Sequence, residues 1–246
     1  MSEPEFYFVG LKRTGAQPLP LTGPLPRDRA EAWINGASQE LVMLPWSQTP
    51  SAEDHDMADM LLKRATYEDV LNAPPGFRAE ILEGRLVLMP RPASLHLYAA
   101  SALNGLLWPP FHEGTGGPGG WIILPEPEIH FGKEPDLELA DPDLAGWRIE
   151  HMPQLPDIAH FTLIPDWICE VISPSSEKND TVIKPRLYQS FGLAYYWIVD
   201  PREHTLETRV LKDNVLEHAE TFRDADIVAA PPFHDVPFNL DKLWPK

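Results

Sequence analysis

A single carboxylate stands inside an otherwise apolar stretch of this 246-residue chain. Residues 167–172 read Trp-Ile-Cys-Glu-Val-Ile, a run typical of a fully buried strand, and Glu170 is its fourth residue. An ionised carboxylate in an apolar interior costs several kcal/mol unless a metal, a cation or a shifted pKa compensates it. The sequence therefore predicts a partner for Glu170, and a metal ion is the first candidate.

Two further charged residues could complete a site around Glu170. Asp143 stands at the start of a predicted strand over 144–147, and Lys184 lies one turn into a predicted helix over 181–191. Carboxylates on neighbouring strands can hold a hard divalent cation, while substrate phosphate and water complete its shell. Magnesium is the expected metal, with manganese able to replace it. A nearby ammonium would orient or help to deprotonate the attacking water and stabilise charge on a pentacovalent phosphate.

Three stretches of the chain carry a resemblance to a known family. They are residues 141–147 (Asp-Pro-Asp-Leu-Ala-Gly-Trp), 167–175 (Trp-Ile-Cys-Glu-Val-Ile-Ser-Pro-Ser) and 196–201 (Tyr-Trp-Ile-Val-Asp-Pro). Between the last two, Asp180, Lys184 and Tyr188 match the family's spacing of an Asp, a Lys and a Tyr. Over about residues 67–244, the sequence resembles the prokaryotic putative restriction endonuclease family of the PD-(D/E)XK nuclease superfamily.

This resemblance implies a fold, a metal site and an activity. The fold is the restriction endonuclease-like αβββαβ core, and the activity is that of a magnesium-dependent endodeoxyribonuclease, which hydrolyses phosphodiester bonds in DNA. Asp143 and Glu170 would be metal ligands, and the backbone carbonyl of Val171 a further one. The superfamily places a lysine two residues after its second acid, whereas this chain has Ile172 there. The resemblance therefore points to Lys184, in the next helix, as the catalytic lysine.

The resemblance extends to a Glu in the first hairpin and a His in the following helix, which are here Glu80 and His96. A third carboxylate could bind the metal directly or through water, so Glu80 is a candidate catalytic residue; a surface ion pair is the alternative. His96 is better interpreted as a hydrogen-bonded packing residue than as a ligand. Glu128 is a weaker candidate of the same kind as Glu80, and Tyr188 is assigned to the core.

Caps predict where two of the helices that position these residues begin and end. Thr66 is a candidate N-cap for a short helix over 67–71, and Asp180 for the helix over 181–191. Gly192 follows the second helix as its C-cap.

Apolar spacing and turn residues predict the remaining elements. Residues 94–107 carry an apolar stripe on one helical face, and Pro109-Pro110 ends this pattern. Residues 78–82 and 85–89 form a predicted hairpin that turns at Glu83-Gly84. Further strands are predicted at residues 128–131, 137–139, 144–147, 167–172, 195–199 and 205–211.

The order of these elements indicates the fold class. The strand over 167–172, the helix over 181–191 and the strand over 195–199 form a βαβ crossover. The preceding strands and helix extend this unit into a mixed sheet flanked by helices. We therefore expect an α/β (α+β) fold with a mixed central sheet and an N-terminal hairpin extension.

Composition divides the chain and limits its partners. Residues 1–60 are proline-rich and acidic, which predicts a poorly ordered arm before a nuclease-like domain over 61–246. No stretch approaches the ~20 apolar residues of a membrane span, so we expect a soluble, cytoplasmic protein without a membrane partner. The net charge of −17 opposes non-specific affinity for nucleic acid. Binding to DNA is therefore expected to be weak or assisted by a partner.

Two other functions compete with the nuclease. A non-catalytic interaction protein could keep the same fold and act through the arm or a homodimer interface, with Glu170 neutral or paired. A serine or cysteine hydrolase is poorly supported, because no Gly-x-Ser-x-Gly motif is present and Cys169 lies on the strand face opposite Glu170. If the protein is a nuclease, we expect a local positive rim around the site. Its residues would be Arg85, Arg91, Lys178, Lys184 and Arg186.

Overall fold

The computed structural model describes residues 64–174 and 176–245, together with four short strands nearer the N-terminus. The chain divides into two compact units, Met1–Arg64 and Ala65–Lys246. In the first unit, β1 (Phe6–Leu11) pairs antiparallel with β2 (Leu19–Pro20), β3 (Leu25–Pro26) and β4 (Leu41–Pro45). The rest of the predicted arm lies outside the described residues, and its poor order stays a prediction.

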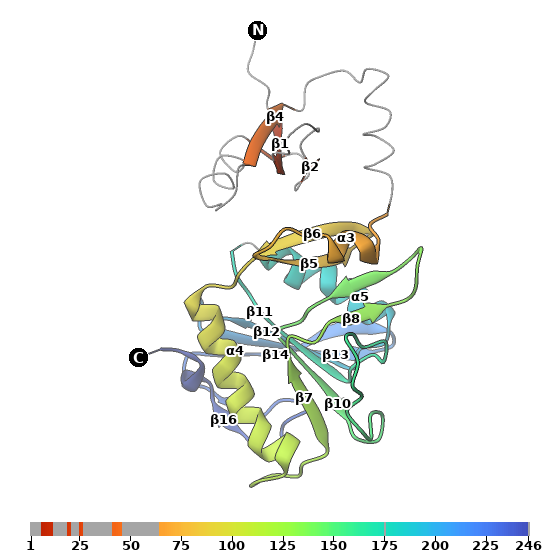
Figure 1. Cartoon of the computed structure of the whole chain (residues 1–246). Helices are drawn as coiled ribbons and strands as arrows, with labels where there is room; N and C mark the ends of the chain where they lie inside the picture. The colour runs from red at the N-terminus through yellow and green to blue at the C-terminus, as the bar shows by residue number, and fades with distance from the viewer. Residues whose placement is uncertain are drawn as a thin grey trace. The chain divides into compact units, whose positions relative to one another are not determined.

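Two β-sheets form the frame of the second unit (Figure 1). The larger sheet has the strand order β14-β13-β12-β11-β10-β7, and the smaller has the order β6-β5-β9-β8. The large sheet consists of β7 (Trp121–Pro125), β10 (Leu144–Arg148), β11 (Trp167–Val171), β12 (Tyr195–Asp200), β13 (Thr205–Lys212) and β14 (Val215–Arg223). The small sheet consists of β5 (Phe77–Leu82), β6 (Arg85–Pro90), β8 (Ile129–Phe131) and β9 (Glu138–Ala140).

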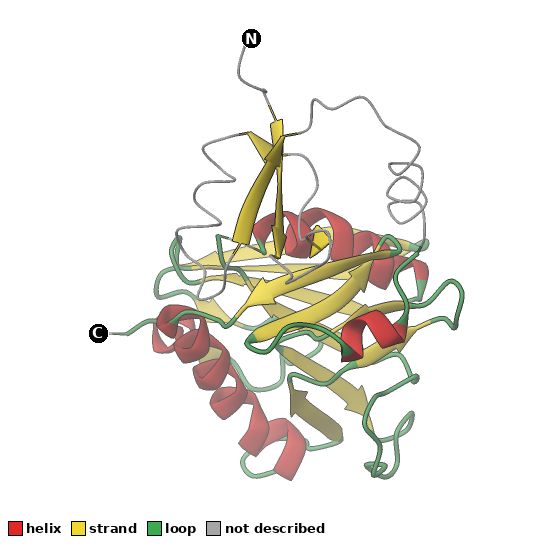
Figure 2. Cartoon of the chain, turned by 45° about the horizontal axis from the view of Figure 1, so that its top comes forward, coloured by secondary structure: helices red, strands yellow, loops and turns green. Residues whose placement is uncertain are grey.

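The predicted βαβ crossover is confirmed. Strands β11 and β12 pair in parallel, with Ile168 opposite Tyr196. The chain passes between them through two consecutive helical segments, η2 (Asn179–Ile183) and α5 (Lys184–Ser190). Figure 2 shows the long helix and this crossover segment on opposite sides of the strands.

Alternation along β11 assigns its side chains to two cores. Trp167 and Cys169 pack in one core with the inner face of α4 (Ser94–Leu107), whereas Ile168 packs in the other with Tyr188 of α5. Even-numbered residues of β11 therefore face the crossover helix and odd-numbered ones face α4. Glu170 and Cys169 consequently lie on opposite faces of the strand, as predicted.

Local sequence signals at the start of the second unit are also confirmed. The helix α3 (Tyr67–Leu71) begins with a capping box, in which the Thr66 hydroxyl accepts from the Asp69 backbone N–H and the Asp69 carboxylate accepts from the Thr66 N–H. Glu83 and Gly84 both have positive φ, 53° and 71°, as the two-residue turn of the β5–β6 hairpin requires.

One predicted cap is wrong and one strand was missed. Asp180 is not an N-cap: it lies inside η2, where its buried carboxylate pairs with Lys184 at i+4. The helix α4 ends at Leu107, before Pro109-Pro110, as predicted, and both prolines then occupy the first turn of η1 (Trp108–Glu113), where no backbone donor is needed. The edge strand β14 was not predicted, since only Leu216 and Phe222 along it are buried.

The other predicted strands are present, with ends that shift by one residue. Gly192 follows the end of α5 with φ of 80°, in agreement with its predicted place after the helix. The described chain closes with β15 (Ile227–Val228), which pairs with β16 (Phe238–Asn239), and the short helix η3 (Leu240–Leu243). Among the described residues, no helix combines the length and apolar character that crossing a membrane needs.

Candidate active site

The site forms where the chain passes from the small sheet to the large one. Strand β9 ends at Ala140 and β10 begins at Leu144, so Asp143 lies in the short connection between the two sheets. Glu80 comes from β5 of the small sheet, and Glu170 comes from β11 of the large sheet. The crossover segment adds Asp180 from η2 and Lys184 from α5 to the same site.

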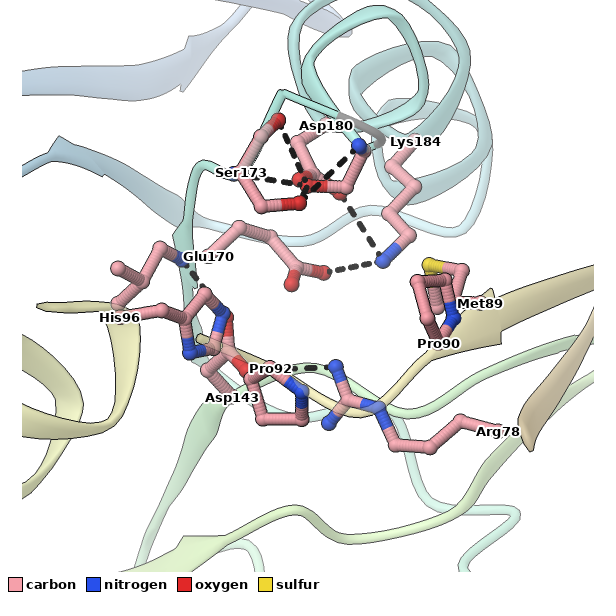
Figure 3. A pocket seen from close by; sticks show the side chains of 12 residues that line it. Arg78, Met89, Pro90, Pro92, His96, Asp143, Glu170, Ser173, Asp180 and Lys184 are labelled. Carbon is pink, nitrogen blue, oxygen red and sulfur yellow. Dashed lines mark hydrogen bonds and ion pairs between the residues drawn. The ribbon is translucent and has the colours of Figure 1, made fainter. Parts of the chain in front are cut away.

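Lys184 is the centre of a buried ion-pair cluster (Figure 3). Its Nζ atom lies 2.9 Å from Glu80 Oε1, 3.0 Å from Glu170 Oε1 and 3.1 Å from Asp180 Oδ1. All four side chains are at most 2% exposed. The Tyr188 hydroxyl donates a further hydrogen bond of 2.7 Å to Glu170 Oε1. The structure thus brings together Glu80, Glu170 and Lys184, three of the four predicted catalytic side chains.

The electrostatics of this cluster hold a proton on Lys184. Burial lowers the pKa of Lys184, but the attraction of the three surrounding carboxylates outweighs it and leaves the pKa well above its usual value. Burial raises the pKa of Glu170 well above its usual value, and the nearby Lys184 ammonium opposes this shift only in part. The three carboxylates therefore favour the ammonium form of Lys184, and ionisation of the buried Glu170 depends on that ammonium.

Asp143, the fourth predicted side chain, lines the same pocket and is held by three donors. Its Oδ2 accepts a 2.7 Å hydrogen bond from the Val171 backbone N–H and lies 3.1 Å from Nε2 of His96. Its Oδ1 lies 3.5 Å from the Arg78 guanidinium. Burial raises the pKa of Asp143, but the hydrogen bonds and charges of these neighbours outweigh it and lower the pKa. Asp143 is therefore an ionised carboxylate with a fixed orientation.

The pocket suits one hard divalent cation. It is a hollow of about 20 Å³, the space of about one water molecule. Asp143 Oδ1 in the pocket wall and Glu80 Oε2 in the adjoining Lys184 cluster are buried and accept no hydrogen bond from any described residue. The charged side chains of the pocket and this cluster are the carboxylates of Glu80, Asp143, Glu170 and Asp180, the Lys184 ammonium and the Arg78 guanidinium. When all are ionised their formal charge is −2, which a single Mg²⁺ would neutralise.

Sequence reasoning missed or misassigned several of these residues. Arg78 was not predicted, although it shares a strand face with Glu80 by the alternation of β5. The sequence predicts Asp180 as a cap and Tyr188 only as a core residue, whereas Asp180 contacts Lys184 and the Tyr188 hydroxyl donates to Glu170. The surface ion pair considered for Glu80 is wrong, because this side chain is fully buried.

Two other predictions, on the positive rim and on Glu128, differ from the structure. Lys184 is buried and cannot be part of a positive rim, while the other four residues of that rim are exposed. Glu128 does not line the pocket and instead contacts His130 and His160.

A wider cavity lies on the other side of Asp143. Its volume is about 320 Å³, and it runs between α4 and the loop after β7. It shares Asp143 and His96 with the narrow pocket, and Asn104 and Glu126 add polar atoms to its wall. The two cavities therefore meet at the carboxylate that the His96 ring orients.

Comparisons with known proteins agree with this architecture. Among solved structures, the chain is similar to a putative nuclease belonging to DUF820 from Anabaena variabilis ATCC 29413, with a TM-score of 0.56 and 20% sequence identity. The similarity covers 73% of this chain and 97% of that one, and it shows a shared fold. No curated protein matches the chain. Residues 64–241 match the family model Uma2, described as putative restriction endonuclease, and the chain therefore belongs to that family.

Proposed function

We propose that this protein is a magnesium-dependent endonuclease that hydrolyses phosphodiester bonds in DNA. The observation that carries the proposal is the buried Lys184 ammonium, which lies among three carboxylates in a pocket that Asp143 also lines. Membership of a putative restriction endonuclease family supports the nuclease class. Asp143 and Glu170 are the proposed metal ligands, the carbonyl of Val171 is a further one, and manganese is expected to replace magnesium.

The bound metal would supply Lewis-acid activation of the scissile phosphate and of a water molecule. Once Glu170 turns towards the metal, Lys184 would have an N–H free to donate to the attacking water or to a phosphate oxygen. In the metal-free site the three carboxylates raise the pKa of Lys184 and keep it protonated. We therefore propose Lys184 first as a positioning and charge-stabilising group.

The remaining pocket residues would prepare the two acids for this role. Glu80 holds the Lys184 ammonium through Oε1, while its second oxygen is free to bind the metal through water. His96 and Arg78 fix the Asp143 carboxylate. Arg78 also lines the pocket with 22% of its side chain exposed, so it can reach a substrate phosphate.

A cleavage assay with isosteric variants tests the proposal. Wild type, Asp143→Asn and Glu170→Gln are incubated with single-stranded, duplex and branched DNA in the presence of Mn²⁺ or Mg²⁺. Each variant keeps the shape of its side chain but lowers its affinity for a cation, so we expect at least about a 100-fold loss of cleavage rate. The exposed Glu217→Gln is the matched control and should cleave as wild type does. Equal cleavage by wild type and both pocket variants would sink the mechanism.

Thermal unfolding separates the nuclease from a non-catalytic protein that keeps the fold. A cation that binds only the native state raises its melting temperature, so Mn²⁺ should stabilise wild type and stabilise Glu170→Gln much less. An absence of both cleavage and a metal-induced shift in wild type would favour the non-catalytic alternative, in which Lys184 alone neutralises Glu170.

A further inference from the structure

A second group of metal-ligating side chains lies on the small sheet, apart from the pocket of Asp143. Glu128, His130 and His160 each offer one ligand atom, and these three atoms lie within 4.8 Å of one another. None of the three residues lines the Asp143 pocket. Glu128 and His130 belong to the edge strand β8 and its approach, whereas His160 belongs to the long connection between β10 and β11.

Backbone hydrogen bonds fix these two segments beside each other. An isolated parallel bridge joins Ile129 to Phe161. The His130 N–H donates to the Phe161 carbonyl at 2.8 Å, and the Phe161 N–H donates to the Glu128 carbonyl at 2.8 Å. Since each bonded residue is a candidate ligand or its immediate neighbour, these bonds fix the backbone from which all three side chains extend.

The side chains converge at one carboxylate oxygen. Nε2 of His130 lies 2.7 Å from Glu128 Oε1, and Nδ1 of His160 lies 4.0 Å from the same atom. The two imidazole rings are stacked, with centroids 3.8 Å apart and planes 2° apart. The Tyr67 ring packs edge-on against both, and burial and the neighbouring Glu128 carboxylate raise the pKa of its hydroxyl.

An unpartnered nitrogen inside this cluster points to a ligand. Nδ1 of His160 is buried, yet it makes no hydrogen bond with any described residue. A buried polar atom without a partner is costly, so such atoms call for an explanation by water or an ion. Two imidazole nitrogens and one carboxylate oxygen make a ligand set that suits Zn²⁺ and similar transition ions better than Mg²⁺.

From this geometry we infer that Glu128, His130 and His160 form a second metal site, which takes a transition-metal ion of the Zn²⁺ class. The ion would replace the proton shared by His130 and Glu128, and it would bind the free Nδ1 of His160. The rings would have to turn out of their parallel stack so that both nitrogens aim at one ion. Three protein ligands leave a fourth position for water, and Tyr67 would orient Glu128 from outside the ligand shell.

Such a site would tie the β10–β11 connection to the edge of the small sheet. In its absence, the bridge between Ile129 and Phe161 and the stacked rings hold these segments together. The ion would therefore stabilise the native chain without taking part in the chemistry proposed for Asp143 and Glu170.

The test is a Zn²⁺ titration of the chelator-treated full chain in the presence of excess Mg²⁺, which occupies oxygen-rich sites. Wild type should bind one Zn²⁺ that His160→Ala and Glu128→Gln bind at least about 100-fold more weakly, because both lose a direct ligand. Tyr67→Phe should weaken binding by about 10-fold, as loss of an outer-shell partner does. The exposed His234→Ala is the control and should bind as wild type does.

Co²⁺ gives a second readout, because its visible absorption is intense in four-coordinate sites and weak when six waters bind it. We expect the intense bands in wild type and in His234→Ala, and their loss in His160→Ala. If circular dichroism shows that His160→Ala does not fold, the isosteric Glu128→Gln decides alone. Zn²⁺ binding that is absent from wild type, or unchanged in Glu128→Gln, overturns the inference. The DNA cleavage assay in Mg²⁺ tests the proposed nuclease separately, so a failure of the Zn²⁺ inference leaves that proposal unaffected.

Discussion

Lys184 gives the site its stability in the absence of a metal. Three buried carboxylates contact this single ammonium, so its removal would leave them uncompensated. Lys184→Met should lower the free energy of unfolding at pH 7 by about 3–5 kcal/mol, as loss of one partner of a buried ion pair does. Urea denaturation measures the effect, and the exposed Lys178→Met is the matched control. A loss below about 1 kcal/mol would mean that water already solvates these carboxylates.

Asp200, at the end of β12, makes stability depend on pH in a predictable direction. Burial raises the pKa of Asp200, but hydrogen bonds from Arg202 and from the Glu203 N–H outweigh it and lower the pKa below 3.8. A carboxyl with a lowered pKa in the folded state stabilises above its unfolded pKa, and this contribution is lost as pH falls through the folded value.

Asp200→Asn should therefore destabilise by roughly 1 kcal/mol at pH 7, an estimate that reflects its partly exposed hydrogen bonds. The difference from wild type should shrink as pH falls below 3.8, where the unfolded carboxyl takes up its proton, and should vanish below the lower pKa of the folded carboxyl. Denaturation midpoints at several pH values measure this trend, with the exposed Asp235→Asn as control. A difference that grows on acidification would contradict the assigned direction.

The residue types of the site were more predictable than their partners. Glu170 was recognisable because a carboxylate is out of place in an apolar strand, and Lys184 because of its spacing from Glu170. The compensation of Glu170 by Lys184 and Tyr188 was not predicted, since it depends on how the crossover helix sits over the strand. Arg78 was missed because a single charged residue in a hairpin has no pattern to mark it.

Packing of β10 between its neighbours leaves no room at Gly146. A Cβ atom there would lie 3.2 Å from Cε3 of Trp121 on β7 and 3.2 Å from Cε3 of Trp167 on β11. Both indoles are buried and held in the core, so they cannot easily give way. Gly146→Ala should destabilise by about 1–3 kcal/mol, the usual cost of overpacking a close-packed core.

Gly105 on α4 is the matched comparison, because nothing lies within 4 Å of a Cβ added there. Replacing a glycine in a helix interior with alanine removes unfolded-state entropy and should stabilise by about 0.5–1 kcal/mol. Thermal unfolding of Gly146→Ala and Gly105→Ala should thus give shifts of opposite sign. Shifts of the same sign would show that the conformational preference of alanine over glycine, and not the space around residue 146, decides the stability of both variants.

Elements were predictable where one face is buried and a turn or cap marks the end. The β5–β6 hairpin meets both conditions, whereas α3 buries none of its residues and is marked by its cap alone; both positions agree with the sequence within one residue. Strand β14 meets neither, because it is an edge strand whose residues are mostly exposed. The prolines after α4 show that a breaker stops one helix but can also begin the next turn.

At the scale of the whole molecule, charge should govern how the protein meets DNA. The net charge is −17, and within the described residues the pocket presents the partly exposed Arg78 beside the fully paired Lys184. A protein that neutralises Z phosphates loses affinity with a salt slope of about −0.9Z. We therefore expect a slope shallower than about −2 when DNA affinity is measured against KCl at fixed Mg²⁺. A slope near −5 would require a basic surface that the pocket residues do not provide.

The fold class was predictable from the order of helices and strands alone, because a βαβ unit preceded by a helix and antiparallel strands can form few arrangements. The division into two sheets was not predictable, since strands of the large and the small sheet have the same apolar alternation. The short connection around Asp143 joins one sheet to the other, as does the segment between β7 and β8, and nothing in its composition marks that role.

The Lys184 cluster has a further consequence for how this unit opens. One ammonium holds a carboxylate of the small sheet, Glu80, and one of the large sheet, Glu170, so neither sheet can separate without exposing a charge of the other. Partial unfolding of either sheet would then cost nearly as much as complete unfolding. The amide hydrogens of β5 and β11 should therefore exchange with solvent in a single cooperative event, because the lysine proposed for catalysis also holds the two sheets together.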